Sequence, residues 1–149
     1  MTKKHKKRLR REGGFTLTEI MVAVFIIGLL STVVIINVAP MIGQSRETKA
    51  TIDIQALSNA LDQYNFDMYD YPSETQGLEA LVEEPDSVPD GARYRQNGYI
   101  QKLPTDPWGR AYVYKRPGTK SGQAYDLYSF GADGQEGGEE ENADIGNWN

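Results

Sequence analysis

The chain has 149 residues, a formal net charge of −5, one histidine and no cysteine. Its length allows one small domain with a modest core, and the lack of cysteine excludes a fold held together by disulfides. Residues 1–14 carry seven Lys or Arg and one Glu, whereas the rest of the chain carries nine Lys or Arg against twenty Asp or Glu. No aromatic or folded basic element accompanies the basic start, so we expect no nucleic-acid partner.

The segment from Phe15 to Ala39 is long and apolar enough to span a membrane. No residue is charged from Ile20 to Ile36, and about 25 residues at the helical rise of about 1.5 Å cover the ~30 Å hydrocarbon core. An ordinary secretory signal peptide is excluded because this run is too long and ends without the small residues of a cleavage site. The basic start favours a cytoplasmic N-terminus, so the acidic remainder is predicted to lie beyond the membrane.

Glu19 is an acid inside this apolar segment. An ionised acid at the bilayer centre costs about 2.5 to 3.5 kcal/mol and usually marks a function. A cut after Gly14 would make Phe15 the new N-terminus, and its amine, from a neighbouring subunit of a filament, could pair with the carboxylate. Alternatively, Glu19 lies about one turn from that end and reaches the headgroups. Position alone leaves both interpretations open.

Residues 14–19, GFTLTE, resemble the leader motif of the type IV pilin and pseudopilin superfamily. The resemblance implies that a prepilin peptidase cuts after Gly14 and methylates the amine of Phe15. It also assigns Glu19 to subunit assembly. The expected leader is then residues 1–14, followed by a transmembrane and filament-core helix over residues 15–39.

Residues 41–67 are predicted to form an amphipathic helix that continues the membrane helix. The superfamily's helix proline falls at the position of Ile36, whereas this chain has Pro40 one turn later, so a kink is expected near Pro40. Apolar residues recur at spacings of three and four, which predicts one face packed on a core. The predicted core positions are Ile52, Ala56, Leu57, Ala60, Leu61 and Tyr64.

Residues 71–82 start with a helix-capping signature. Pro72 interrupts the long helix, Ser73 can cap a new one, and Gln76 stands three residues later, as in a capping box. A short helix ending before Pro85 is therefore predicted, followed by a loop over residues 83–98. The run Y-P-x-x-x-Q-G-L-x-A-L resembles a signature of the major pseudopilins of type II secretion systems.

Residues 99–130 are predicted to form a small antiparallel sheet packed on the helix. A turn over residues 106–109, DPWG, is expected to bury its aromatic ring, and residues 111–115 and 124–130 have strand composition. Tyr112 and Tyr114 are predicted core residues. The L-P-x-D-P-W-G-x-x-Y pattern also resembles the pseudopilin family.

Residues 131–148 place acids and an asparagine among glycines, a composition that supplies oxygen ligands for a cation such as Ca²⁺. Composition alone favours a disordered acidic tail instead. Ile145 and Trp148 count against disorder because they can anchor the tail to the domain.

This last segment resembles the calcium loop of the major pseudopilins, which implies structural Ca²⁺ bound by Asp133 and Asp144. Further ligands are expected among Glu139, Glu140, Glu141, Asn142 and the backbone carbonyl of Phe130. A bound Ca²⁺ would close the loop against the sheet, as a disulfide does in other exported domains.

No catalytic constellation is recognisable, because His5 lies in the leader and neither a phosphate loop nor a nucleophile elbow is present. We therefore expect no enzymatic activity. Taken with the resemblance, the sequence predicts an α+β, type IV pilin-like fold with a long N-terminal helix, a small antiparallel sheet and a C-terminal calcium loop. The globular domain is predicted to comprise residues 40–149 and to lie in the periplasm, beyond a single inner-membrane span.

The function implied by the resemblance is that of the major subunit of a type II secretion pseudopilus, a periplasmic filament that drives export of folded proteins. Its implied partners are further copies of itself in a helical homopolymer, minor pseudopilins, the prepilin peptidase, an inner-membrane assembly platform and membrane lipid. A type IV pilin of an external fibre is the alternative, although such pilins commonly carry a C-terminal disulfide loop. A monomeric, membrane-anchored Ca²⁺-binding module is a third possibility.

Overall fold

The computed structural model describes residues 14–149, and within them the side chains of residues 33–40 are left undescribed. The predicted leader therefore lies outside the described residues except for Gly14. The chain divides into two compact units, Met1–Pro40 and Met41–Asn149, and each is described by itself.

The first unit holds the start of the long helix α1, Leu17–Met68. Its apolar side chains are exposed, including Phe15, Leu17 and Phe25. Among the residues described, no helix reaches the length and hydropathy of a membrane span. The predicted span extends over residues 33–39, whose side chains are not described, and it stays a prediction, as does the kink near Pro40.

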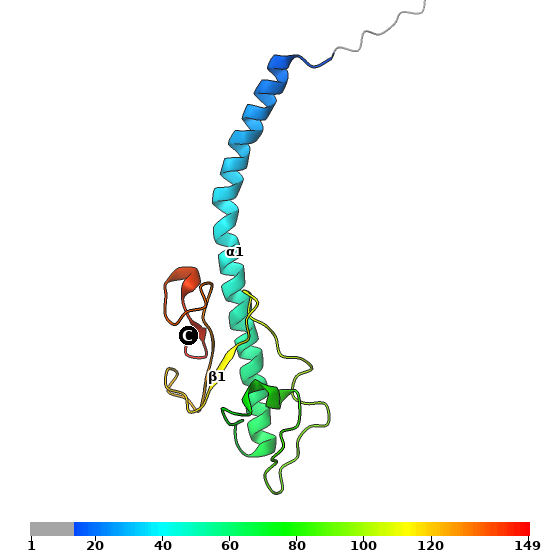
Figure 1. The fold of residues 1–149 in the computed structure, drawn as a ribbon, viewed down its shortest axis with the longest axis vertical. Helices are drawn as coiled ribbons and strands as arrows, with labels where there is room; N and C mark the ends of the chain where they lie inside the picture. The colour runs from blue at the N-terminus through cyan, green and yellow to red at the C-terminus, as the bar shows by residue number, and fades with distance from the viewer. Residues whose placement is uncertain (1–13) are drawn as a thin grey trace, which may run out of the picture. The chain divides into compact units, whose positions relative to one another are not determined.

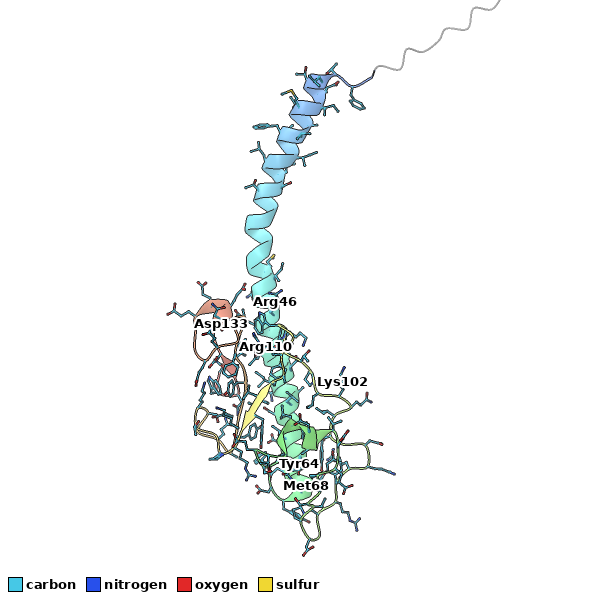
Figure 2. The ribbon with its side chains drawn as sticks, viewed as in Figure 1. Arg46, Tyr64, Met68, Lys102, Arg110 and Asp133 are labelled. Atoms are coloured by element: carbon cyan, nitrogen blue, oxygen red, sulfur yellow. The ribbon has the colours of Figure 1, made fainter. Side chains whose placement is uncertain are left out.

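The second unit is built around the C-terminal part of α1 (Figure 1), which buries one stripe of side chains. The stripe follows the three and four residue spacing of a helix face that packs on a core, and Tyr64 and Met68 occupy its C-terminal end (Figure 2). Its members are Ala50, Ile54, Leu57, Ala60, Leu61, Tyr64 and Met68.

The phase predicted for this helix face was partly wrong. Four predicted positions are buried, namely Leu57, Ala60, Leu61 and Tyr64, but Ile52 is 62% exposed and Ala56 is also exposed. Side chains on one face of a helix fall three or four residues apart, and the stripe that contains Leu57 runs back through Ile54 and Ala50. Ile52 therefore points away from the core although it is apolar.

A three-stranded antiparallel sheet in the order β1-β2-β3 packs on this stripe. Strand β1, Val113–Lys115, pairs with β2, Asp126–Ser129, which also pairs with β3, Ile145–Gly146. All four residues of β2 are buried, as expected for the central strand. The two predicted strands are confirmed in shortened form, and β3 was not predicted.

A 3₁₀ helix, η1, Gly77–Leu81, covers another part of the core. The predicted capping box forms: the Ser73 N–H donates to Gln76 Oε1 at 2.8 Å, and the Gln76 N–H donates to Ser73 Oγ at 3.2 Å. Both bonds fix the turn that leads into η1, whose own N-cap residue, Gln76, makes no side-chain capping hydrogen bond. The loop over residues 83–98 is held through Tyr94, whose ring packs against Tyr64, as does the ring of Tyr99 directly after the loop.

The turn over residues 106–109 closes by a hydrogen bond of 3.0 Å from the Gly109 N–H to the Asp106 carbonyl. Its most buried residue is Asp106, at 4% exposure, whereas the Trp108 ring is half-buried, so the predicted burial of the ring is only partly correct. The Asp106 carboxylate accepts hydrogen bonds from the backbone of Trp108 and Arg110 and from the Ser129 hydroxyl. The turn is thereby tied to β2.

The phase of α1 can be tested by comparing two truncations. Leu57→Ala should lower the free energy of unfolding by about 2 to 5 kcal/mol because it opens a cavity in the core. Ile52→Ala, on the exposed face, should change it by less than about 1 kcal/mol. Urea unfolding of the full chain in detergent micelles, followed by tryptophan fluorescence, measures both. Equal losses would contradict the assigned stripe.

Candidate functional site

The N-terminal end of α1 holds Glu19 in a second capping box. The Thr16 N–H and hydroxyl donate to Glu19 Oε2 at 3.0 and 3.1 Å, and the Glu19 N–H donates to Thr16 Oγ1 at 3.2 Å. The carboxylate therefore caps the helix start, where the helix dipole also favours a negative charge. The sequence analysis missed this contact, although the T-x-x-E spacing that signals it is present.

The predicted processing site lies in the residues just before this cap. Helix α1 begins at Leu17, so Gly14 and Phe15 precede it, and both are exposed. Apart from its neighbours in the chain, no atom of the described residues lies within 4 Å of the position that a Cβ on Gly14 would occupy. The peptide bond after Gly14 is thus sterically open and not helical.

The C-terminal loop, residues 130–144, follows a defined path between β2 and β3. The Ala132 N–H donates to the Glu141 carbonyl at 2.8 Å, and Arg110 donates to the carbonyls of Gly131 and Ala132. Figure 2 shows Arg110 beside the loop that carries Asp133. This arrangement does not match the disordered tail that composition alone favours.

The two predicted anchors of the loop are confirmed. Ile145 lies in β3 and packs against the core, and the Trp148 ring lies 5.4 Å from that of Tyr128 in β2. The Leu127 N–H also donates to Asn147 Oδ1 at 3.0 Å. The chain end is therefore held on the sheet by both apolar contacts and hydrogen bonds.

The predicted calcium ligands of the loop do not converge as side chains. Asp133 is exposed, and its Oδ1 accepts the Gln135 N–H at 3.0 Å in a local turn. The short helix η2, Glu140–Asn142, has no buried residue. Within the described part of the chain, no three His, Cys, Asp or Glu side chains lie close enough together to hold a metal ion.

Asp144 fits a cation ligand better than the other predicted residues. Its side chain is 11% exposed, and Oδ1 is buried without a hydrogen-bond partner among the residues described. A buried carboxylate oxygen without a donor is costly and suits a cation. The chemistry of this donor fits Ca²⁺, with the remaining oxygens to come from the loop backbone or from water.

Lys120, which the sequence analysis did not single out, contacts the same carboxylate. Its Nζ lies 3.1 Å from Asp144 Oδ2 and 2.8 Å from Glu136 Oε1. Its hydrogen bonds to Glu136 and Asp144 raise the pKa of the Lys120 ammonium, and the hydrogen bond from Lys120 lowers the pKa of Glu136. Lys120 is separated from these acids by a long stretch of sequence, so no local pattern indicates the contact.

Asp126, in β2, shapes the turn that carries Lys120. It is 1% exposed, and its carboxylate accepts the N–H groups of Thr119, Lys120 and Ser121 at 2.7, 2.8 and 2.8 Å. Burial raises the pKa of this carboxyl, but the hydrogen bonds from the turn outweigh burial, and the pKa lies well below its ordinary value. The acid is thus held ionised inside the domain.

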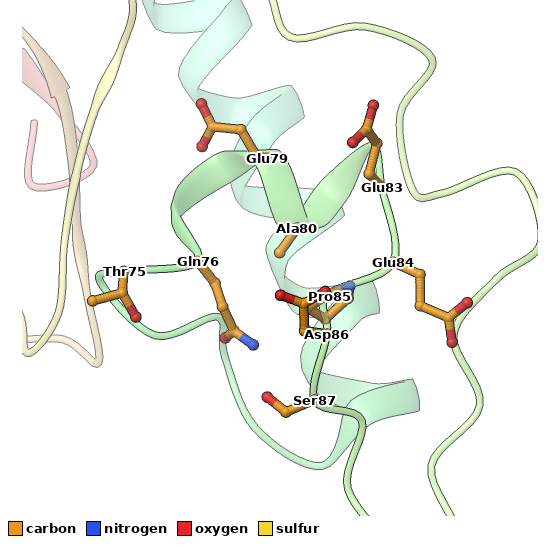
Figure 3. A pocket seen from close by; sticks show the side chains of 9 residues that line it. All are labelled: Thr75, Gln76, Glu79, Ala80, Glu83, Glu84, Pro85, Asp86 and Ser87. Carbon is orange, nitrogen blue, oxygen red and sulfur yellow. The ribbon is translucent and has the colours of Figure 1, made fainter.

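An open hollow beside η1 is also lined by several acidic residues. Figure 3 shows the carboxylates of Glu79, Glu83 and Glu84 pointing in different directions, not toward one centre. The hollow is lined by Thr75, Gln76, Glu79, Ala80, Glu83, Glu84, Pro85, Asp86 and Ser87. These residues include no histidine, lysine or cysteine that could act with the acids in catalysis.

Two family descriptions match the sequence and together cover most of it. Residues 37–148 match type II secretion system (T2SS), protein G, and residues 9–35 match the prokaryotic N-terminal methylation motif. The chain is 50% identical over 139 residues to the type II secretion system core protein G of Pseudomonas aeruginosa, covering 93% of this chain and 96% of that protein. It is 48% identical over 138 residues to the protein of the same name from Escherichia coli K12, covering 93% and 92%.

A solved structure is also similar to this one. It is the crystal structure of the major pseudopilin from the type 2 secretion system of enterohaemorrhagic Escherichia coli, with a TM-score of 0.60 and 42% identity. The match covers 70% of this chain and 88% of that chain. The predicted α+β, pilin-like fold is therefore confirmed.

The buried Asp126 should make stability depend on pH. Because folding lowers its pKa, it stabilises the fold above the pKa of the unfolded chain, and this contribution is lost as the pH falls from about 5 toward 2. Asp126→Asn should cost about 1.5 to 3 kcal/mol at pH 7 and flatten the acid limb of a plot of unfolding free energy against pH. The exposed Asp90→Asn, with the same charge change, should behave as the wild type. A steep acid limb in Asp126→Asn would contradict the assignment.

Proposed function

The chain belongs to the type II secretion system protein G family, and from this we propose that it is the major structural subunit of a type II secretion pseudopilus. The observation that carries the proposal is the match of residues 9–35 to the methylation motif and of residues 37–148 to protein G in one chain. Subunits wait in the inner membrane, join a helical filament through their N-terminal helices and drive folded proteins toward the outer membrane. No catalytic activity is part of this proposal.

The proposed cellular location of the chain and its proposed partners follow from its role as a pseudopilus subunit. The N-terminus lies in the cytoplasm and the domain after Pro40 in the periplasm, because the basic leader favours cytoplasmic retention and an apolar segment follows it. The filament contacts are made mainly with further copies of this chain. Minor pseudopilins, an inner-membrane assembly platform and membrane lipid are the remaining proposed partners.

The prepilin peptidase is the processing partner that we propose. It cuts after Gly14 and methylates the amine of Phe15. Support comes from the exposed, non-helical segment before Leu17, since a peptidase needs access to an extended backbone. Cleavage removes the basic leader and leaves the capped helix start intact, because Thr16 and Glu19 both lie after the cut.

Glu19 has the assembly role in this proposal. After cleavage the amine of Phe15 and the carboxylate of Glu19 lie at the same end of α1, so one subunit can offer each charge to its neighbour. Pairing the two charges removes the cost of holding either alone in the membrane. Within the subunit, Glu19 also caps α1 through Thr16.

Two substitutions of Glu19 can distinguish the role of its negative charge from its role in capping α1. Glu19→Gln keeps a side-chain oxygen for the Thr16 N–H, because glutamine also serves in capping boxes, but it removes the charge. We expect Glu19→Gln and Glu19→Ala to abolish filament formation equally while membrane insertion persists. Filaments are scored by electron microscopy of the periplasmic fraction released when the outer membrane is opened, and insertion by membrane fractionation. Filaments formed by Glu19→Gln at wild-type levels would show that capping, not charge, is what assembly needs.

We also infer that the C-terminal loop binds structural Ca²⁺ with Asp144 as a carboxylate ligand. The buried, donor-free Oδ1 of Asp144 supports this inference. A bound Ca²⁺ neutralises the oxygens around it and ties their backbone segments together. The further proposed ligands are Asp133, Glu139, Glu140, Glu141, Asn142 and the carbonyl of Phe130.

Thermal unfolding of the full chain in detergent micelles tests the calcium site. Added Ca²⁺ should raise the midpoint relative to EGTA, with about 2.7 kcal/mol of stabilisation at a concentration of 100 times Kd. Asp144→Asn should abolish the increase, and Asp133→Asn should reduce it. Mg²⁺ at the same concentration is the control, because it is smaller and demands stricter geometry. An unchanged wild-type midpoint would refute the calcium site.

A further inference from the structure

Lys120 is enclosed by groups from three later segments of the chain. Its ammonium bridges the carboxylates of Glu136 and Asp144 at 2.8 and 3.1 Å. It also lies over the aromatic rings of Tyr128 and Trp148, at 4.8 and 5.5 Å from their centroids. These rings add cation–π attraction and reduce contact with water, and the Lys120 side chain is only 29% exposed.

The backbone of Lys120 is fixed as well as its side chain. The Lys120 N–H donates to the buried carboxylate of Asp126 in the central strand, so the turn that carries the lysine cannot shift freely. The two acids follow β2 in the chain, whereas Lys120 precedes it. Glu136 is inside the C-terminal loop, and Asp144 immediately precedes β3. One ammonium group thus joins the turn before β2 to both the middle and the end of the loop.

We propose that Lys120 is a tethered cation that closes the C-terminal loop, and that Ca²⁺ must compete with it for Asp144. A cross-link between distant segments stabilises a fold by limiting the freedom of the loop that it closes. Lys120 supplies such a link without disulfide or metal. The loop of this chain therefore stays closed when Ca²⁺ is absent.

The competition follows from the contacts of Asp144. Lys120 occupies Oδ2, and Oδ1 is the oxygen without a donor. A divalent cation on this carboxylate repels the ammonium beside it, so its binding weakens the link to Lys120. Lys120 consequently lowers the affinity for Ca²⁺ and makes closure of the loop less dependent on the metal. This second half of the proposal rests on the proposed calcium site.

Two substitutions remove the tether without touching a proposed calcium ligand. Lys120→Met keeps the length and the contact with the rings but removes the charge, and Glu136→Gln removes one partner of the ion pair. The control is Lys102→Met, at an exposed lysine that lies away from the C-terminal loop (Figure 2). Lys120→Arg, which retains a cation, should restore most of what Lys120→Met loses.

The first readout is made in EGTA on the full chain in detergent micelles. Lys120→Met and Glu136→Gln should lower the thermal midpoint by about 1 to 4 °C and speed cleavage at Glu139–Glu141 by a glutamate-specific protease. Tryptophan fluorescence should change as well, because Trp148 lies beside the ammonium. If Lys120→Met behaves as Lys102→Met in EGTA, the tether does not exist and the proposal is overturned.

The second readout is a Ca²⁺ titration followed by the same fluorescence. The apparent Kd of Lys120→Met should be tighter than that of the wild type by about twofold to fivefold, as expected when one competing ion pair is lost. An equal Kd in the two proteins would overturn the proposal that Lys120 competes with Ca²⁺ for Asp144. If neither protein responds to Ca²⁺, the proposed calcium site fails, whereas the EGTA measurements still decide whether Lys120 closes the loop.

Discussion

The buried stripe of α1 is the surface on which the second unit depends. Leu57, Leu61 and Tyr64 are nearly inaccessible to water, and β1, β2 and η1 all contribute side chains to the same cluster. Burial of such side chains contributes about 1.5 to 3 kcal/mol each. Because the sheet has only three short strands, its backbone hydrogen bonds alone could not hold it, and the helix supplies the apolar face that it needs.

Buried polar groups then fix the loops that the apolar core cannot reach. Asp106 holds the turn before β1 against Ser129, and Asp126 gathers three backbone N–H groups of the turn before β2. The Tyr114 hydroxyl reaches from β1 to the Pro72 carbonyl at 2.8 Å. In a chain without cysteine, these contacts take the place of cross-links. Each is favourable only while every buried donor and acceptor is paired, so the loops are held cooperatively.

The features predicted from sequence are those whose cause is local. The capping box of Ser73 and Gln76 formed as predicted because its residues lie three positions apart, and the anchors Ile145 and Trp148 are apolar residues within an acidic segment. The phase of α1 was misassigned at Ile52 because an apolar residue beside a stripe looks like a member of it. The contact of Lys120 with Asp144 could not be predicted, since it depends on the register of β2 with both neighbouring strands.

The C-terminal loop approaches α1 closely at Gly43. The position that a Cβ on Gly43 would occupy lies 2.7 Å from the carboxyl carbon of Glu141, so any larger residue would push this side chain away from the helix. The loop is therefore confined on one side by α1, near Gly43, and on the other by β3, which starts at Ile145. Between these limits the loop carries mainly acidic side chains, whose mutual repulsion is reduced by nearby positive charge. Arg110 supplies positive charge to the carbonyls at the start of the loop, and Lys120 supplies it to the carboxylates at its middle and end. The loop is thus an anionic segment whose folded path depends on positive charge from Arg110 and Lys120, in the turns beside the sheet.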